Sequence, residues 1–206
     1  MTLLFFVVAA YLLGSISFAV LTSKVFGLDD PRSYGSGNPG ATNVLRSGKK
    51  GIAALTLFGD VAKGWLAVFL AIHFAPPDGN VHLLEAAVAL AAFIGHIFPV
   101  FHKFKGGKGV ATALGVLLGI NPWMGVAIFA AWLLAATVFR YSSLAALIAA
   151  IAGPVFALLI PLPLELIIAT VVMTLLLIWR HKSNIRNLLA GKENKIGSKK
   201  KEIHSA

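Results

Sequence analysis

Seven apolar segments separated by short polar or turn-forming stretches dominate the chain and restrict its fold more than any other feature. A helix that crosses a hydrocarbon core of about 30 Å needs roughly 20 predominantly apolar residues. Hydrophobic residues make up 58% of the chain and its mean hydropathy is +0.84, well above the balance of a soluble domain. We therefore predict an all-α polytopic membrane protein with about seven transmembrane helices. The segments cover residues 3–25, 51–75, 83–101, 110–120, 123–139, 144–160 and 164–179.

The fourth segment, residues 110–120, is short, because at 1.5 Å per residue it covers only about 17 Å, half of the core. Either this helix tilts into a deep loop, or the polar stretch before it dips inward. A dipping loop is tolerated only where protein or water satisfies its backbone.

Lysine and arginine occupy alternate loops, and this distribution predicts an orientation. They follow the first, third, fifth and seventh segments, whereas the loops 76–82, 120–123 and 161–163 contain none. Short loops rich in Lys and Arg stay in the cytoplasm. We therefore predict an outside N-terminus and an inside C-terminus, a parity that requires all seven crossings. Only Lys63, inside the second segment, departs from the pattern.

Three polar clusters lie on the predicted cytoplasmic side, and each combines cations with small or amide residues. The first runs from Ser36 to Asn43 and is followed by Arg46. Its glycines allow close backbone approach, its hydroxyls and amides donate hydrogen bonds, and Arg46 can grip an oxyanion through two N–H groups. The alternative is an ordinary Asn-Pro-Gly turn. The candidate phosphate ligands here are Ser36, Gly37, Asn38, Thr42, Asn43 and Arg46.

The second cluster is a glycine loop that opens the fourth helix. Amide N–H groups and the helix dipole favour anions at such an N-terminus. The loop is no Walker motif, because His102 stands where that pattern needs glycine and Gly109 where it needs Ser or Thr. The alternative is a plain basic cytoplasmic loop. The candidate phosphate ligands are Lys105, Gly106, Gly107, Lys108, Gly109 and Thr112.

The third cluster, residues 180–186, ends the seventh helix. A basic flank beside the interfacial Trp179 would explain its charge but not Asn184. His181 and Asn184 are spaced i and i+3, so they share a helical face and can direct hydrogen bonds to one target. Beyond Glu193 we predict a basic, disordered cytoplasmic tail over 194–206, which leaves 1–193 as a single membrane domain.

Four further polar residues are candidates for support of these loops. Asp60 and Lys63 are expensive in lipid and can pair at their i, i+3 spacing, either as a neutralised buried pair or as a pair that orients the phosphate loops. His96 can brace a loop or make an ordinary structural hydrogen bond. Glu193 can hold a cation of the phosphate pocket or form a surface pair.

Several other chemistries are disfavoured. The chain has no cysteine, which excludes disulfides, thiolate metal sites and a cysteine acyl-enzyme. His73 and Asp78 have the His-four-residues-Asp spacing of thioester-dependent acyltransferases, but they lie on the predicted outer side and two prolines intervene. No His pair is spaced i, i+4 with a carboxylate between for a metal site. The pair Asp29-Asp30, the one acidic pair available to a metal-dependent head-group enzyme, is typical of a helix-end turn.

The three clusters, with Gly95-His96-Ile97-Phe98-Pro99 ahead of the second, resemble in order the motifs of the bacterial acyl-phosphate:glycerol-3-phosphate acyltransferases. The resemblance extends from the first helix to Glu193. It implies a seven-helix inner-membrane enzyme that transfers a fatty acyl group from acyl phosphate to the 1-hydroxyl of glycerol 3-phosphate. The products would be lysophosphatidic acid and phosphate, in the first step of phospholipid synthesis.

By the same resemblance, Ser36, Arg46, Lys108, His181 and Asn184 are the expected catalytic residues. His181 and Asn184 would orient the glycerol moiety, and either His181 or a phosphate oxygen of the acyl donor would take the hydroxyl proton. We expect a monomer in the bilayer with its site on the cytoplasmic face, and no metal, cofactor or nucleic acid. The alternative is a phosphate or organophosphate transporter, against which stand the lack of a repeat and the gathering of cations at one face.

Overall fold

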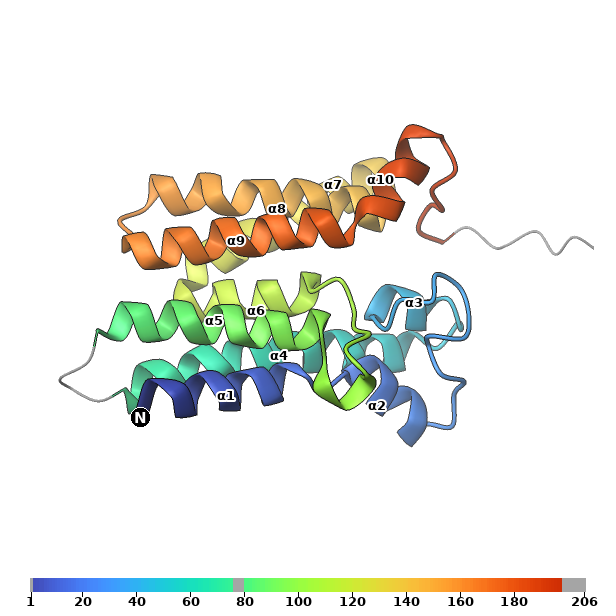
Figure 1. The fold of residues 1–206 in the computed structure, drawn as a ribbon. Helices are drawn as coiled ribbons and strands as arrows, with labels where there is room; N and C mark the ends of the chain where they lie inside the picture. The colour runs from blue at the N-terminus through green and yellow to red at the C-terminus, as the bar shows by residue number, and fades with distance from the viewer. Residues whose placement is uncertain (1, 76–79, 198–206) are drawn as a thin grey trace, which may run out of the picture.

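The computed structural model describes residues 2–75 and 80–197, and every regular element in these ranges is helical. Seven longer helices lie side by side along one common direction (Figure 1). Their bounds are α1 Thr2–Gly14, α4 Lys50–Phe74, α5 Val81–Ile97, α6 Val110–Ile120, α7 Pro122–Phe139, α8 Ser142–Leu159 and α9 Leu164–Arg180. The shorter elements are α2 Phe18–Val25, α3 Ala41–Leu45, the 3₁₀ turn η1 Val100–His102 and α10 Lys182–Leu189.

Length and composition make the described part of the chain a polytopic membrane protein. Four helices are long and apolar enough to cross a membrane, namely α4, α5 with η1, α7 and α8. The number rises to six if the bent pairs α1 with α2 and α9 with α10 each count as one span. The remaining apolar helix, α6, has the predicted bounds and is as short as the sequence indicated, with 11 residues.

The first apolar segment, expected to be one helix over 3–25, is broken into α1 and α2 with a bend of 46°. The serines on either side of Ile16 explain the break. The hydroxyl of Ser15 donates to the Tyr11 carbonyl at 2.8 Å, and Ser17 caps α2 by accepting from the Val20 amide at 3.5 Å. Such side chains offer the backbone an alternative to continuing the helix. The break leaves the carbonyl of Ile16 outside both helical ladders.

Helix α6 packs directly on α4 through glycines. A β-carbon at Gly115 would overlap the carbonyl oxygen of Val61, and one at Gly64 would overlap the carbonyl of Thr112. Small residues allow this backbone approach between membrane helices. The N-terminal end of α6, where the second polar cluster lies, is therefore set firmly against α4.

The short helices and polar loops gather at one end of the helix bundle, opposite the chain's N-terminus (Figure 1). Helices α2, α3 and α10 and the loop that contains η1 all lie there. The chain also continues in an ordered form past the predicted domain end. Ile196 donates its amide to the Arg140 carbonyl at 2.6 Å, and Arg140 Nη2 donates to the Ile196 carbonyl at 3.3 Å. Residues 194–197, which the sequence assigned to the tail, thus include a contact with the end of α7, and the remainder of the tail lies outside the described residues.

Candidate active site

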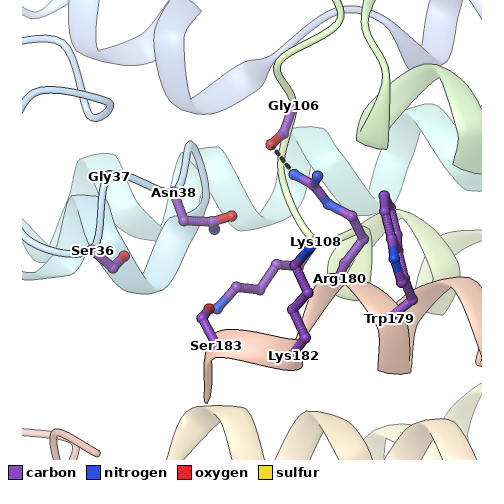
Figure 2. Close-up of a pocket in the computed structure, with 9 residues that line it drawn as sticks. All are labelled: Ser36, Gly37, Asn38, Gly106, Lys108, Trp179, Arg180, Lys182 and Ser183. Atoms are coloured by element: carbon purple, nitrogen blue, oxygen red, sulfur yellow. Dashed lines mark hydrogen bonds between the residues drawn. The ribbon is translucent and has the colours of Figure 1, made fainter. Parts of the chain in front are cut away.

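The three polar clusters meet around one pocket of about 290 Å³ at this end of the bundle (Figure 2). Each cluster contributes to its wall, although the clusters are far apart in the sequence. Cationic side chains come from the second and third clusters, and hydroxyl and amide groups from the first. The lining residues are Ser36, Gly37, Asn38, Gly106, Lys108, Trp179, Arg180, Lys182 and Ser183.

Asn43 builds the first polar loop from within. Its side chain is buried, and its Nδ2 donates to the carbonyls of Pro31 at 2.6 Å and Tyr34 at 3.1 Å. Its Oδ1 accepts from the Ser36 amide at 3.0 Å. These three bonds occupy its amide, and Asn43, expected as a direct phosphate ligand, is not part of the pocket lining. Asn43 instead holds Ser36 and Gly37 in place, and Gly37 adopts a φ of +66° that suits glycine.

Thr42 and Arg46, on either side of that residue, have different surroundings. The Thr42 hydroxyl lies 3.1 Å from the hydroxyl of Ser142, at the start of α8. Arg46 follows α3, is exposed, and is not part of the pocket lining. It is nevertheless close enough for its charge to act on Lys108, whose pKa it lowers.

The glycine loop of the second cluster is held from two sides. The Gly107 amide donates to the His96 carbonyl at 3.2 Å. From the other side, Arg180 donates through Nη2 to the Gly106 carbonyl at 2.8 Å (Figure 2). Its Nε donates to the Gly107 carbonyl at 3.1 Å. The loop ends at Gly109, which caps α6 with a φ of +86°.

Two predicted phosphate ligands of this cluster lie away from the pocket. The Lys105 side chain is exposed to the surface, and Thr112 is fully buried in the first turn of α6. Neither lines the cavity. Lys108 alone of the loop's lysines reaches it.

A chain of hydrogen bonds links Lys108 to the C-terminal segment. Lys108 Nζ donates to Asn184 Oδ1 at 2.5 Å, and Asn184 Nδ2 donates to Glu193 Oε1 at 2.7 Å. The same carboxylate oxygen accepts from the Ser143 hydroxyl at 2.6 Å. Glu193 is therefore linked to the pocket lysine through Asn184. Ser142 and Ser143 were missed because a Tyr-Ser-Ser sequence at a helix start carries no signal beyond a turn.

The charge states of Lys108 and His181 follow from burial. Burial is the main cause that lowers the pKa of Lys108 from its usual 10.5 to about 8, and Glu193 opposes this shift. His181, just beyond the last residue of α9, has its pKa lowered to about 4, first by burial and then by the charge of Lys108. Its Nδ1 donates to the Leu177 carbonyl at 2.8 Å, so the lone pair lies on Nε2. At neutral pH this imidazole is uncharged and a weak base.

Arg180 was not among the predicted catalytic or binding residues, although it belongs to the third cluster. Its guanidinium carbon lies 5.9 Å from the ring centroid of Phe98 and 5.7 Å from that of Trp179. These contacts, with the two bonds to the glycine loop, fix a positive charge at the pocket wall. A basic flank was sufficient to explain the charge of residues 180–186, so the role of Arg180 at the pocket wall was not predicted.

The predicted supporting residues Asp60, Lys63 and His96 form one buried cluster behind the glycine loop. Lys63 Nζ lies 2.8 Å from Asp60 Oδ1 and 3.0 Å from His96 Nδ1. Of the His73–Asp78 pair, His73 stacks on Phe69 near the end of α4 that is remote from the pocket, whereas Asp78 lies outside the described residues. Asp30 forms an ion pair with Arg32 at 2.5 Å. Within 2–75 and 80–197, no three His, Asp or Glu residues are grouped for a metal ion.

Comparisons with known proteins agree with this arrangement. The glycerol-3-phosphate acyltransferase family pattern matches residues 4–191. The chain belongs to that family. It is 60% identical over 196 residues to the glycerol-3-phosphate acyltransferase of Ralstonia nicotianae, with 95% of each chain covered. It is 59% identical over 201 residues to that of a Janthinobacterium species, covering 98% of this chain and all of the relative.

Two solved structures of a family member, the integral membrane glycerol 3-phosphate acyltransferase PlsY, share the fold. Its glycerol 3-phosphate form has a TM-score of 0.89 and 40% identity, with 96% of both chains covered. Its lysophosphatidic acid form has a TM-score of 0.87 and 39% identity, with 95% of both chains covered. The likeness therefore extends over nearly the whole helix arrangement.

Proposed function

We propose that this protein transfers a fatty acyl group from acyl phosphate to the 1-hydroxyl of glycerol 3-phosphate, giving lysophosphatidic acid and inorganic phosphate. The observation that carries the proposal is the single pocket to which all three polar clusters contribute. Both substrates carry phosphate, and the pocket offers Lys108, Arg180 and Lys182 with hydroxyl and amide donors opposite them. Family membership and the bound forms of PlsY support the same acceptor and product.

The reaction needs no covalent enzyme intermediate, because acyl phosphate is already a mixed anhydride. The 1-hydroxyl oxygen of glycerol 3-phosphate attacks the acyl carbonyl carbon, and the bond from that carbon to the phosphate oxygen breaks. Phosphate leaves with the electron pair. Lys108, Arg46 and the Ser36–Asn38 loop bind the phosphates, and the donors already in place stabilise charge that develops on the carbonyl oxygen and the leaving group. Asn184 and His181 orient the glycerol moiety.

The hydroxyl proton passes to an oxygen of the leaving phosphate in this scheme. A general base works best with a pKa near the working pH. His181, with its pKa lowered to about 4, is too weak for this task, whereas its Nε2 lone pair can accept a hydrogen bond from the acceptor hydroxyl and align it. Phosphate esters have a second pKa of about 6, which suits proton acceptance at neutral pH.

We further propose seven crossings of the bacterial inner membrane, with the N-terminus outside and the pocket on the cytoplasmic face. This topology counts α6 as a short span and α1 with α2 as one. Support comes from Figure 1, in which the chain's start lies at one end of the bundle, and the pocket loops and α10 at the other.

The test is phosphate release by the purified protein given palmitoyl phosphate and glycerol 3-phosphate, with palmitoyl-CoA as a parallel donor. We expect release that needs both substrates, fails with the thioester, and falls about ten- to 150-fold in Arg46→Ala, since a charge-assisted phosphate contact contributes about 1.5–3 kcal/mol. Arg32→Ala is the matched control, because Arg32 is an exposed arginine paired with Asp30 outside the pocket. Uptake of labelled glycerol 3-phosphate into vesicles without acylation would instead establish a transporter.

A further inference from the structure

The buried cluster of Asp60, Lys63 and His96 contacts the glycine loop directly, although none of the three lines the pocket. Asp60 and Lys63 are each 2% exposed and His96 is 7% exposed. The members come from two helices, α4 and α5. An unpaired buried charge is costly, but Asp60 and Lys63 already neutralise each other and would need no third partner for that purpose. The contacts of His96 therefore require an explanation of their own.

The contacts of Lys63 determine which nitrogen of His96 carries the proton. An ammonium group has three hydrogens and no acceptor. Lys63 donates to the Ile16 carbonyl at 2.6 Å, pairs with Asp60 Oδ1 at 2.8 Å, and lies 3.0 Å from His96 Nδ1. Asp60 Oδ1 lies farther from Nδ1, at 3.5 Å, so the nearer ammonium makes Nδ1 an acceptor and places the ring hydrogen on Nε2. A neutral His96 also leaves the cluster with no net charge, as burial favours.

The Nε2 side of the ring faces the glycine loop at its junction with the first polar loop. A β-carbon on Gly107 would overlap His96 Nε2, and that same point lies 3.1 Å from the carbonyl oxygen of Pro39. His96 holds the loop through its backbone as well, because its carbonyl accepts from the Gly107 amide. One residue thus contacts Gly107 with both its ring and its main chain.

We propose that Asp60, Lys63 and His96 are positioning residues for phosphate binding, in which Lys63 fixes the orientation and tautomer of His96, and His96 holds Gly107 against the first polar loop. The proposal rests on the acyltransferase function proposed above. Substrate is held by Lys108 and by the Ser36–Asn38 loop, and the distance between these two groups is set where Gly107 and Pro39 meet. If the ring of His96 turns, the two halves of the phosphate site separate.

The first test separates charge balance from positioning. The double variant Asp60→Asn with Lys63→Met keeps the cluster neutral and of similar volume but removes the ammonium that orients His96. We expect the variant to fold, with kcat/KM for glycerol 3-phosphate at least tenfold below wild type and most of the loss in KM. Full activity in the folded double variant would overturn the proposal. Glu85→Gln is the matched control, since Glu85 is a buried carboxylate on the same helix as His96 but at the opposite end.

The second test remains decisive if the double variant fails to fold. The amide nitrogen of glutamine can replace Nε2 of histidine, whereas that of asparagine reaches only the Nδ1 position. We expect His96→Gln to retain at least tenfold more activity than His96→Asn at similar thermal stability. Equal activity of the two variants would refute a role for the Nε2 side of the ring.

A spectroscopic test needs no activity at all. In ¹⁵N-histidine-labelled protein, the ring signals lost in His96→Gln identify His96, and we expect an acceptor Nδ1 and a protonated Nε2. Lys63→Met should shift these signals toward a mixture of tautomers. A donor Nδ1 in the wild type would overturn the tautomer assignment. If the wild type showed this tautomer but no acyl transfer, the proposed function would fail and the positioning of His96 would stand.

Discussion

Lys108 should control the alkaline limb of activity, because its pKa of about 8 is far below that of an ordinary lysine. The charged form binds phosphate and is present below this pKa. As the pH rises through about 8 the charge is lost, so kcat/KM should fall about tenfold for each further unit, and only about a tenth of the free enzyme stays competent at pH 9. The shift from 10.5 to about 8 corresponds to about 3 kcal/mol against the charged form. A bound phosphate stabilises the charged form of Lys108 and so raises its pKa in the complex. The alkaline limb of kcat should therefore lie at higher pH than that of kcat/KM.

The perturbation that checks this assignment is Lys108→Arg, because a guanidinium stays protonated throughout the range. Phosphate release is followed from pH 6 to about pH 9.5, with an enzyme-free blank for the alkaline hydrolysis of acyl phosphate. We expect the variant to be slower than wild type at pH 7, since its fork does not fit the contact with Asn184, but to lose its alkaline limb. Lys103→Arg, an exposed change in the same loop, should leave the profile unaltered. An unchanged limb in Lys108→Arg would refute the reasoning.

Two further substitutions test the loops that form the pocket. Gly107→Ala places a methyl group on the His96 ring, and overpacking of this kind costs about 1–3 kcal/mol. We expect kcat/KM to fall about ten- to a hundredfold in this variant. Gly51→Ala, where a β-carbon meets open space, should retain full activity. Equal rates in the two variants would show that the glycine loop can shift to accept the methyl group without loss of activity. Asn43→Ala leaves three backbone groups without partners, at about 1–3 kcal/mol for each one that stays buried. Asn43→Ala should therefore lower the melting temperature and raise KM for glycerol 3-phosphate. Asn187→Ala, a change at an exposed asparagine, should do neither. An unshifted melting curve for Asn43→Ala would contradict its structural role.

Local patterns in the sequence predicted most of the helices but not the break in the first one. Helix α6 has the expected bounds, because Gly109 before it and Asn121-Pro122 after it are strong local signals. The break at Ile16 depends on Ser15 and Ser17, whose hydroxyls can equally well bond within a continuous helix. In the broken form the Ile16 carbonyl also gains a partner that local sequence cannot show, Lys63 of α4.

The sequence predicted which three polar clusters form the candidate site, but not which of their residues line the pocket and which support the loops. Phosphate chemistry explains why Ser36, Lys108 and Asn184 were identified together. Sequence patterns could not separate Asn43, which builds the loop, from Asn38, which lines the pocket, since both are small amides in one polar stretch. The carboxylate partner of Ser143 lies at residue 193, and a contact over this distance in the chain has no periodic signature.

The contact between Lys63 and the Ile16 carbonyl also bears on how the chain enters the membrane. Alone in lipid, the broken first helix would expose a carbonyl with no partner, and α4 would carry two charged groups whose insertion costs about 2.5–3.5 kcal/mol each. Lys63 of α4 donates a hydrogen bond to the Ile16 carbonyl, which gives both groups a partner. The first two apolar segments are therefore more stable in lipid as a pair than either is alone, and the contact that joins them is also the one that holds Lys63 beside His96.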